Sequence, residues 1–272
     1  MIERDRGRTP LQKVAAAIVT ILVVMVVGAI VRFGVREGVE SAQIATLDAA
    51  DLERELNGAM SEYPHIQTVY GVMRNDFPND WENFLNESLS EIKGGASSED
   101  MRQSGFEFMR NFTAKNAALA SRASSERLSA IIDAQTEVIL YLRTVSPQQC
   151  AKFGLDGSLD PKTLSVEDAE LLNRLSAVTA QVMYAIRDGK LNNNAEGALI
   201  DDAGWEKVAT NYQKIAGDTD GLLAIENGTI KKSSEEEQCS TSANLYKAIQ
   251  ASGAEVSAGF LRLSIKEKPA AN

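Results

Sequence analysis

An uninterrupted apolar run near the N-terminus most constrains what this chain of 272 residues can become. Val14 to Val31 contains eighteen residues without a single charge. As a helix, with about 1.5 Å of rise per residue, the run is roughly 27 Å long, close to the hydrocarbon thickness of a bilayer of about 30 Å. The sequence therefore predicts a single transmembrane helix over residues 14–34, which places the protein in the lipid bilayer.

Basic residues around this run predict its orientation. Four of them precede the run and two follow it closely: Arg4, Arg6, Arg8 and Lys13, then Arg32 and Arg36. Lys and Arg favour the cytoplasmic side, which puts residues 1–13 in the cytoplasm and the rest of the chain outside. The alternative is a cleaved signal peptide, whose apolar region is usually about 7 to 15 residues long and is followed by a small-x-small site. The greater length here favours an uncleaved anchor in a bacterial inner membrane, with a periplasmic domain.

The chain beyond the predicted anchor is strongly acidic. After residue 36 it carries 22 basic and 36 acidic side chains, a balance of −14. Such a surface repels nucleic-acid phosphates and anionic lipid headgroups, so we expect no nucleic-acid partner. Cationic or neutral partners are compatible with this charge. An acidic surface that serves solubility alone is the alternative interpretation.

The two cysteines, Cys150 and Cys239, both lie in the predicted outer domain. In an oxidising compartment this even number predicts one disulfide. Closing a loop of about 90 residues would stabilise the fold by roughly 4 to 5 kcal/mol in the chain-entropy model. Both residues also lie near expected helix starts, where the helix dipole favours a thiolate, so a redox-sensing pair is the alternative. A single histidine and the absence of a CxxC spacing predict no metal and no cofactor.

The outer domain is predicted to be helical almost throughout, because alternating β-branched patterns are missing. Four helix starts combine a capping residue with an acceptor near the third helical position: Ser97 with Asp100, Ser146 with Pro147 and Gln149, Ser165 with Asp168, and Ser234 with Glu237. The clearest amphipathic pattern runs from Glu167 to Ile186. Further helices are expected over residues 66–75, 80–93, 125–145, 205–225, 234–251 and 256–266.

These segments predict an all-α protein in which residues 61–266 form an extracytoplasmic multi-helix bundle of six to eight helices. Four-helix packing with additional hairpins is the expected arrangement, and the absence of a repeat of 30 to 45 residues argues against a solenoid. Residues 35–60 are expected to form a helical stalk or linker, and residues 267–272 a disordered tail. Whether the helices on either side of residues 120–124 fuse or meet at a kink stays open.

Candidate catalytic residues are few. His65 is the single histidine, and a histidine at a helix start is usually exposed or hydrogen-bonded rather than catalytic. Two acid pairs, Asp201 with Asp202 and Glu82 with Glu87, are of the kind that glycosidases use. With 36 carboxylates in the domain, such pairs also arise by chance. We therefore assign no catalytic residue.

Two glycine-containing segments are candidate ligand loops. Residues 217–221 read Gly-Asp-Thr-Asp-Gly, but an EF-hand alignment puts Ala216 and Asn227 at two ligand positions, so a turn is expected. Residues 154–157 lack the lysine and strand context of a phosphate-binding loop. Aromatic residues are the remaining candidates for a ligand pocket, with core packing as the alternative: Trp81, Trp205, Phe106, Phe108 and Phe112.

Three classes of function are compatible with these features. The first is a non-catalytic interaction or scaffolding module of the cell envelope that binds an unknown envelope protein. The second is a small-molecule-sensing domain, which would have to signal through a partner because thirteen cytoplasmic residues cannot hold an output domain. The third is a membrane-anchored cell-wall hydrolase. A homodimer through the anchor, whose small-residue face includes Gly28, stays open. The first class is favoured because it needs only a surface.

Overall fold

The computed structural model describes residues 47–60, 64–157, 159, 168–192 and 196–266. The expected cytoplasmic segment, the transmembrane helix over residues 14–34 and the C-terminal tail lie outside the described residues. Among the helices that are described, none has the length and apolar character needed to cross a membrane.

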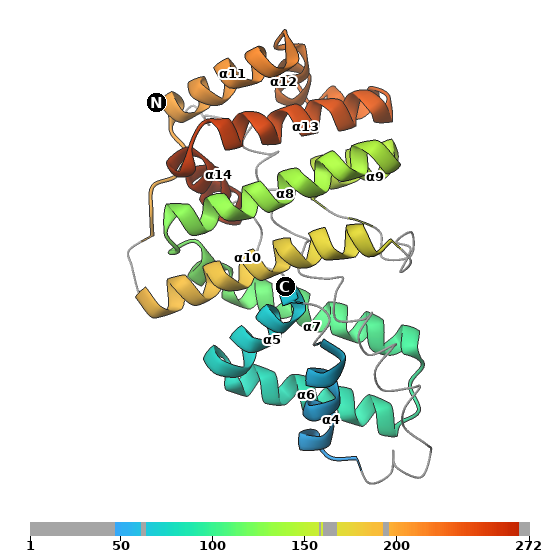
Figure 1. Ribbon diagram of the computed structural model, residues 1–272. Helices are drawn as coiled ribbons and strands as arrows, with labels where there is room; N and C mark the ends of the chain where they lie inside the picture. The colour runs from blue at the N-terminus through green and yellow to red at the C-terminus, as the bar shows by residue number, and fades with distance from the viewer. Residues whose placement is uncertain (1–46, 61–63, 158, 160–167, 193–195, 267–272) are drawn as a thin grey trace, which may run out of the picture.

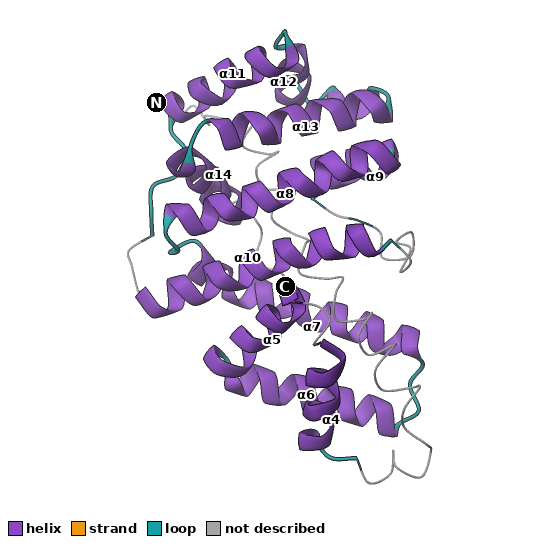
Figure 2. Ribbon diagram, in the orientation of Figure 1, coloured by secondary structure: helices purple, strands orange, loops and turns teal. Residues whose placement is uncertain are grey.

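The described ranges contain eleven α-helices and one short 3-10 helix, with no strand (Figure 2). The all-α class is thereby confirmed, whereas the expected six to eight helices were too few. Their bounds are α4 (Ala49–Met60), α5 (Pro64–Asp76), α6 (Pro78–Lys93), α7 (Ser98–Ala120), α8 (Ser125–Val145), α9 (Pro147–Asp156), α10 (Ala169–Asn192), α11 (Asp202–Ala216), α12 (Asp220–Glu226), η2 (Ile230–Lys232), α13 (Glu235–Ala251) and α14 (Ala254–Lys266).

Predicted capping residues set several of these boundaries. Ser97 and Ser234 each form a capping box with the acidic residue three positions later. Ser146 caps α9, whose first residue is a proline. The start of α10 is capped by Asp168, whose carboxylate accepts a hydrogen bond from the N–H of Leu171 at 3.0 Å. The predicted cap Ser165 lies outside the described residues.

Short interruptions account for the additional helices. Ser124 caps α8 directly after the turn that ends α7, so the two helices do not fuse. Ser146 both ends α8 and begins α9. Gly217, with φ of 91°, ends α11 and separates it from α12. Helix α4 lies within the range expected to be a stalk, yet its Leu52 and Leu56 are buried in the common core.

The helices stack in a row along the molecule, in the spatial order α6, α7, α10, α8, α13 and α11 (Figure 1). Beside this row, α5 packs against α10 and α6, and α4 packs against α5 and α6; α9 continues the line of α8, and α14 packs against α8. A helical bundle is confirmed. The expected four-helix packing is not found in the described residues, because the helices lie side by side in a row and do not surround a common axis. The core accordingly extends along the whole row.

Helix α10 lies between α7 and α8, although it follows both of them in the sequence (Figure 1). The predicted apolar stripe of this helix is largely buried: Leu171, Leu175, Val178 and Ile186 are buried, and Val182 is partly buried. Close approach to α7 requires a glycine, because a Cβ on Gly189 would lie 1.8 Å from the carbonyl oxygen of Leu119. The absence of a side chain at position 189 therefore lets α10 pack closely against α7.

A buried arginine ties α14 to the turn between α7 and α8. Arg262 is 4% exposed, and it donates hydrogen bonds to the carbonyl oxygens of Ser121 at 3.0 Å, Ala123 at 2.9 Å and Ala198 at 3.3 Å. Burial lowers the pKa of its guanidinium, while the carbonyls at the end of α7 offer the negative end of a helix dipole. Gly197 passes directly over the group, since a Cβ there would lie 2.3 Å from Cζ.

Candidate functional site

A groove of about 550 Å³ runs between α6 and α7, near one end of the row. Its lining combines acidic, aromatic and small polar side chains: Asp80, Glu87, Ser90 and Glu91 from α6, and Ser104, Glu107, Phe108, Asn111, Phe112 and Lys115 from α7. From Asp80 to Glu91 the helix advances about 16 Å, or three turns. The hollow is therefore long enough to receive a short helical segment.

The floor of the groove is aromatic. Phe108 is partly exposed in it, and its ring lies 5.1 Å from the ring of Phe84. Phe84 in turn stacks on Trp81 at 5.5 Å, so the floor continues into the hydrophobic core. Residues three apart on α6 share one face, which is why Trp81 and Phe84 both turn toward the packed side of that helix.

The rim of the groove carries negative charge. Lys115 and Asp80 form an ion pair of 2.7 Å at one end. Glu87, Glu91 and Glu107 have no cationic partner within the part of the chain that the structure describes. These three carboxylates face a partly apolar hollow, where they attract cationic groups more strongly than isolated surface charges would.

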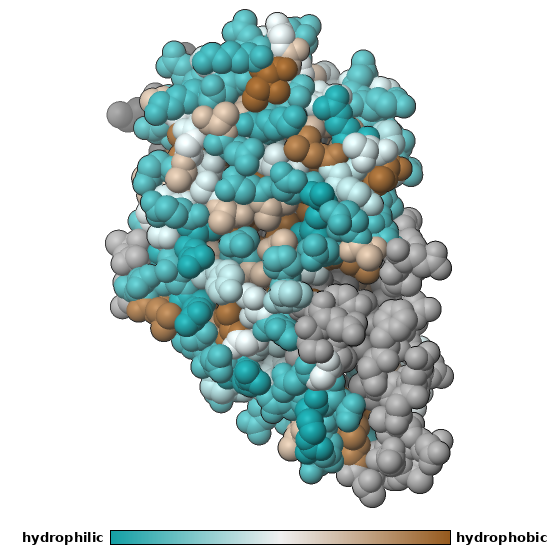
Figure 3. All heavy atoms as spheres, viewed as in Figure 1, coloured by the Kyte–Doolittle hydropathy of each residue, from teal (hydrophilic) through white to brown (hydrophobic). Residues whose placement is uncertain are grey.

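Beyond the groove, the described residues include few exposed large hydrophobic side chains. On the face seen in Figure 3, hydrophobic residues are scattered among hydrophilic ones. The large hydrophobic side chains that are exposed lie on different helices: Val145, Leu191, Ile215 and Leu223. Scattered residues of this kind are normal for a protein surface and mark no docking patch.

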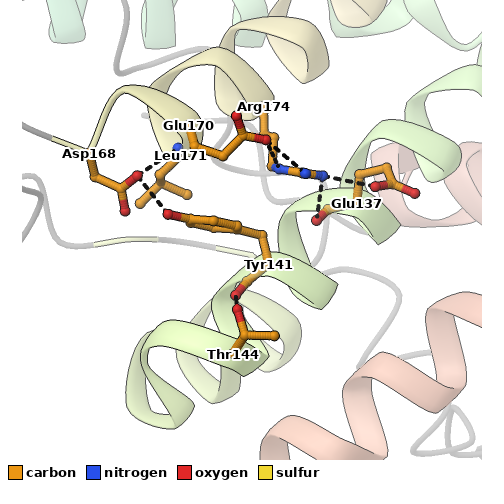
Figure 4. A network of polar contacts seen from close by, with 7 residues as sticks. All are labelled: Glu137, Tyr141, Thr144, Asp168, Glu170, Leu171 and Arg174. Carbon is orange, nitrogen blue, oxygen red and sulfur yellow. Dashed lines mark hydrogen bonds and ion pairs between the residues drawn. The ribbon is translucent and has the colours of Figure 1, made fainter.

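A second polar cluster joins α8 to the start of α10 (Figure 4). Tyr141 donates its hydroxyl to the Asp168 carboxylate at 2.7 Å. Arg174 binds Glu137 and Glu170 at 2.8 Å each, and its guanidinium lies 5.3 Å from the centre of the Tyr141 ring. The hydrogen bond to Asp168 raises the pKa of Tyr141. Each charged or hydroxyl group of this cluster has a partner within it. We therefore interpret the cluster as a structural contact that holds α8 against the start of α10.

The predicted catalytic candidates occupy separate places in the fold. His65 lies in the first turn of α5 and is partly exposed. Asp201 caps α11 by accepting a hydrogen bond from the N–H of Gly204 at 2.8 Å, and Asp202 is an exposed residue of the same first turn. Glu82 and Glu87 are five residues apart on α6, which directs them about 140° apart around the helix. Neither acid pair forms a facing pair.

The two glycine-containing segments are helix ends. Residues 217–219 form the turn between α11 and α12, and residues 220 and 221 are the first residues of α12; Asp218 accepts a hydrogen bond from the N–H of Asp220. Gly154 lies within α9, and Gly157 ends that helix with φ of 62°. In the described ranges no group of three or more His, Cys, Asp or Glu residues is placed to hold a metal.

The aromatic candidates do not gather in one pocket. Trp81 and Phe108 belong to the same aromatic group through Phe84. Trp205, on α11, packs instead against Phe260 of α14 with ring centres 5.9 Å apart. Phe106 and Phe112 are buried in the core. Core packing therefore describes most of these residues, and Phe108 is the one that reaches into the groove through a partly exposed ring.

Cys150 and Cys239 come together as predicted. The structure places them at disulfide distance, with Cα atoms 5.1 Å apart, and both side chains are buried between α9 and α13. One turn further on, a Cβ on Gly154 would lie 2.2 Å from the Cβ of Ser242. The two helices thus meet closely at the position of the bridge.

Sequence reasoning missed the groove itself. Its signal is present in the sequence, since Asp80, Glu87 and Glu91 follow one another at intervals of seven and four residues, which place them along one side of a helix.

Comparison of the whole chain with models of protein families, with curated proteins and with solved structures finds no match.

Proposed function

We propose that this protein is a non-catalytic interaction module of the bacterial cell envelope. In this proposal residues 14–34 anchor it in the inner membrane, and the helical domain lies in the periplasm. Its α6–α7 groove binds a basic, amphipathic helical segment of another envelope protein. The observation that carries the proposal is a set of three carboxylates, Glu87, Glu91 and Glu107, around the partly exposed ring of Phe108; none of the three pairs with a cation among the residues that the structure describes.

The chemistry of the groove defines its partner. An amphipathic helix that lies in a groove places apolar residues on the floor and polar residues on the rim. Here Phe108 would receive an apolar side chain, and the three glutamates would receive Lys or Arg. Charge complementarity of this kind raises the association rate and selects against acidic competitors. Because Glu87 and Glu107 are exposed and Glu91 is partly exposed, we expect binding to weaken as the ionic strength rises.

Hydrolysis finds less support in the geometry. A glycosidase needs two carboxyl groups on opposite sides of one bond, about 5 to 9.5 Å apart. Of the two predicted acid pairs, Asp201 serves as a helix cap and Glu82 points away from Glu87. The capping role of Asp201 and the divergent directions of Glu82 and Glu87 favour a binding function over a catalytic one.

A designed peptide tests the groove. The peptide is a helix of about fourteen residues with Lys or Arg along one side and Leu along the other, and a matched peptide carries Glu in place of each basic residue. The full-length protein in detergent should bind the basic peptide and not the acidic one. The triple variant E87Q/E91Q/E107Q should weaken binding by about tenfold or more, as expected for losing several rim charges.

The matched control is E82Q/E126Q/E206Q, which removes the same charge from exposed positions outside the groove. It should change the affinity by less than about twofold, because these carboxylates lie away from the peptide. Equal losses in the two triple variants would mean that the peptide responds to overall charge, and the groove proposal would then be wrong.

The anchored topology needs a separate test. A cysteine introduced at Ala203, an exposed residue of α11, reports which side of the membrane the domain occupies. A membrane-impermeant maleimide should label it in intact spheroplasts, on a protein whose gel mobility matches the full length. Labelling only after lysis would reverse the proposed orientation, and a shortened protein would show that the N-terminal segment is removed.

A further inference from the structure

Charge is distributed unevenly along the α6–α7 groove. At one end, which we call the paired end, the ion pair of Asp80 and Lys115 joins the first turn of α6 to the later part of α7. Glu87 lies seven residues beyond Asp80, and Glu107 lies eight residues before Lys115, so both are about two turns away from this pair. Glu91 lies one further turn along α6. The other end of the groove, next to the connection from α6 to α7, is therefore its acidic end.

The two ends offer opposite chemistry to a ligand. At the paired end the Asp80 side chain is 20% exposed and that of Lys115 is 66% exposed, so the ammonium is the more accessible group. An ammonium has three N–H donors, and the pair with one carboxylate leaves donors for another acceptor. At the acidic end Glu107 accepts a hydrogen bond of 3.1 Å from the amide of Gln103, a neutral partner that leaves its negative charge in place. The paired end thus presents donors and the acidic end presents acceptors.

A helix is polar in the same sense. Its first turn has N–H groups without an intrahelical partner and carries a partial positive charge, while its last turn has free carbonyls and a partial negative charge. With its N-terminus at the acidic end, a docked helix would place its first turn beside Glu91 and Glu107 and its last carbonyls beside Lys115. The reverse direction would place those carbonyls beside the carboxylates. Both ends of the groove therefore favour the same direction.

We propose that the groove fixes the direction of the helix that it binds, with the N-terminus of the helix at the acidic end. The bound helix then runs parallel to α7 and antiparallel to α6. This inference rests on the proposed binding of a basic amphipathic helix, and it specifies the partner further. Basic side chains find carboxylates only at the acidic end, so the partner carries its Lys and Arg residues mainly in the N-terminal half of the segment.

Such a segment is a poor helix on its own. Basic residues near the N-terminus of a helix oppose its dipole, which disfavours the helix in solution. Docking beside Glu87, Glu91 and Glu107 reverses this effect, because the carboxylates interact favourably with the basic side chains and with the N-terminal N–H groups alike. The partner segment should therefore become helical as it binds.

Fluorescence quenching measures the direction in the full-length protein in detergent. The probe is the basic helical peptide described above, with blocked ends and a nitroxide at either its N-terminus or its C-terminus. A bimane fluorophore is attached to a cysteine introduced either at Ser90, an exposed residue of the acidic end, or at Ala118, an exposed residue three positions beyond Lys115. The N-terminal nitroxide should quench at position 90 about threefold more than at position 118, and the C-terminal nitroxide should show the reverse.

Two variants connect this direction to the ion pair. Lys115→Gln leaves the Asp80 carboxylate without its partner, so both ends become acidic and the two nitroxides should quench both positions about equally. The double variant D80N/K115Q removes both charges and is the matched control. It should keep the direction, because its net charge equals that of the unmodified protein and the three glutamates remain.

A pair of peptides tests the partner preference. Both have the same composition and a hydrocarbon staple that makes them helical, but one carries its four Lys residues in the N-terminal half and the other carries them in the C-terminal half. The first should bind about threefold or more tightly, because only it satisfies the carboxylates and the helix dipole together.

Three outcomes overturn the inference: equal quenching at positions 90 and 118 by either nitroxide, the reversed pattern, or equal affinity for the two stapled peptides. In each of these cases the basic peptide still binds, so the peptide groove itself stands. Absence of binding by every basic peptide contradicts the groove as well as its direction. Failure of this inference is thereby distinguished from failure of the proposed function.

Discussion

Arg262 donates a hydrogen bond from Nε to the carbonyl oxygen of Ser121, 141 residues earlier in the chain, at 3.0 Å. With the bond to Ala123, this contact supplies donors to carbonyls that the end of α7 leaves unpaired. Arg262→Met should lower the free energy of unfolding by about 2 to 4 kcal/mol, because buried carbonyls lose their partners. Arg262→Lys should be intermediate, since one ammonium cannot reproduce the planar fork. Urea unfolding followed by circular dichroism measures both, and an unchanged Arg262→Met would contradict this role.

Gly189 and Gly71 should respond in opposite ways to the same substitution. Alanine at position 189 would place its Cβ 1.8 Å from the carbonyl oxygen of Leu119, so α10 must move away from α7. We expect Gly189→Ala to lower the free energy of unfolding by about 2 kcal/mol or more. Gly71→Ala enters open space and should raise it by about 0.5 to 1 kcal/mol through helix propensity. The pair is measured in one series of urea unfolding curves. Equal effects at both positions would show that the close helix contact does not exist.

The bridge between Cys150 and Cys239 encloses a sequence separation of 89 residues. Replacing both cysteines by alanine should lower the free energy of unfolding by about 2 to 5 kcal/mol, because the unfolded chain regains the freedom that the loop closure removes. The unmodified protein after reduction serves as the comparison, and it should match the double variant. Unfolding curves that are identical with and without reductant would argue that the two sulfurs are not bonded.

Alkaline pH should destabilise the fold through its tyrosines. Burial raises the pKa of Tyr70, Tyr212 and Tyr246, and the hydrogen bond to Asp168 raises that of Tyr141. Raised phenol pKa values contribute stability that is fully present below the unfolded value of about 10 and is lost as the pH rises above it.

Absorbance at 295 nm, recorded together with circular dichroism, follows this titration. Fewer than the six tyrosines of the chain should ionise before helicity is lost, and the rest should ionise with unfolding. Tyr141→Phe is the control that removes one titrating group. Ionisation of all six near pH 10 in a protein that keeps its helices would contradict the described burial.

The local elements of the fold were predictable because their causes are local. Ser97 and Ser234 are capping residues that act on an N–H three positions away, and both begin the helices that the sequence predicts. The spacing of apolar residues likewise predicted the buried face of α10, which continues to Asn192, beyond the predicted end at Ile186.

The order of the row was not predictable from these signals. It depends on contacts between distant segments, such as that of Gly189 with Leu119 and that of Gly259 with Ile200. A glycine inside a helix only suggests a close approach, and it does not identify the segment that approaches. Gly71 illustrates this limit, because it has the same local setting and meets no neighbour.

The candidate sites divide in the same way. The acidic side of α6 is visible in the sequence as a spacing, whereas the opposite wall of the groove, with Glu107 and Phe108 of α7, becomes visible only when the two helices have been placed side by side. Arg262 gives no sequence signal either, since an arginine among apolar helical residues is ordinarily expected to face solvent.

The position of α10 between α7 and α8 determines the order in which the protein can fold. As the chain is synthesised, α7 and α8 emerge before the helix that separates them, so they cannot close on each other in the native arrangement. Native pairing must wait for residues 169–192, and the Arg262 contact must wait for the last helix. Folding that depends on such distant contacts is slow and leaves apolar faces open in the meantime. We therefore expect incomplete chains of this protein to require a holding chaperone until α14 has been made.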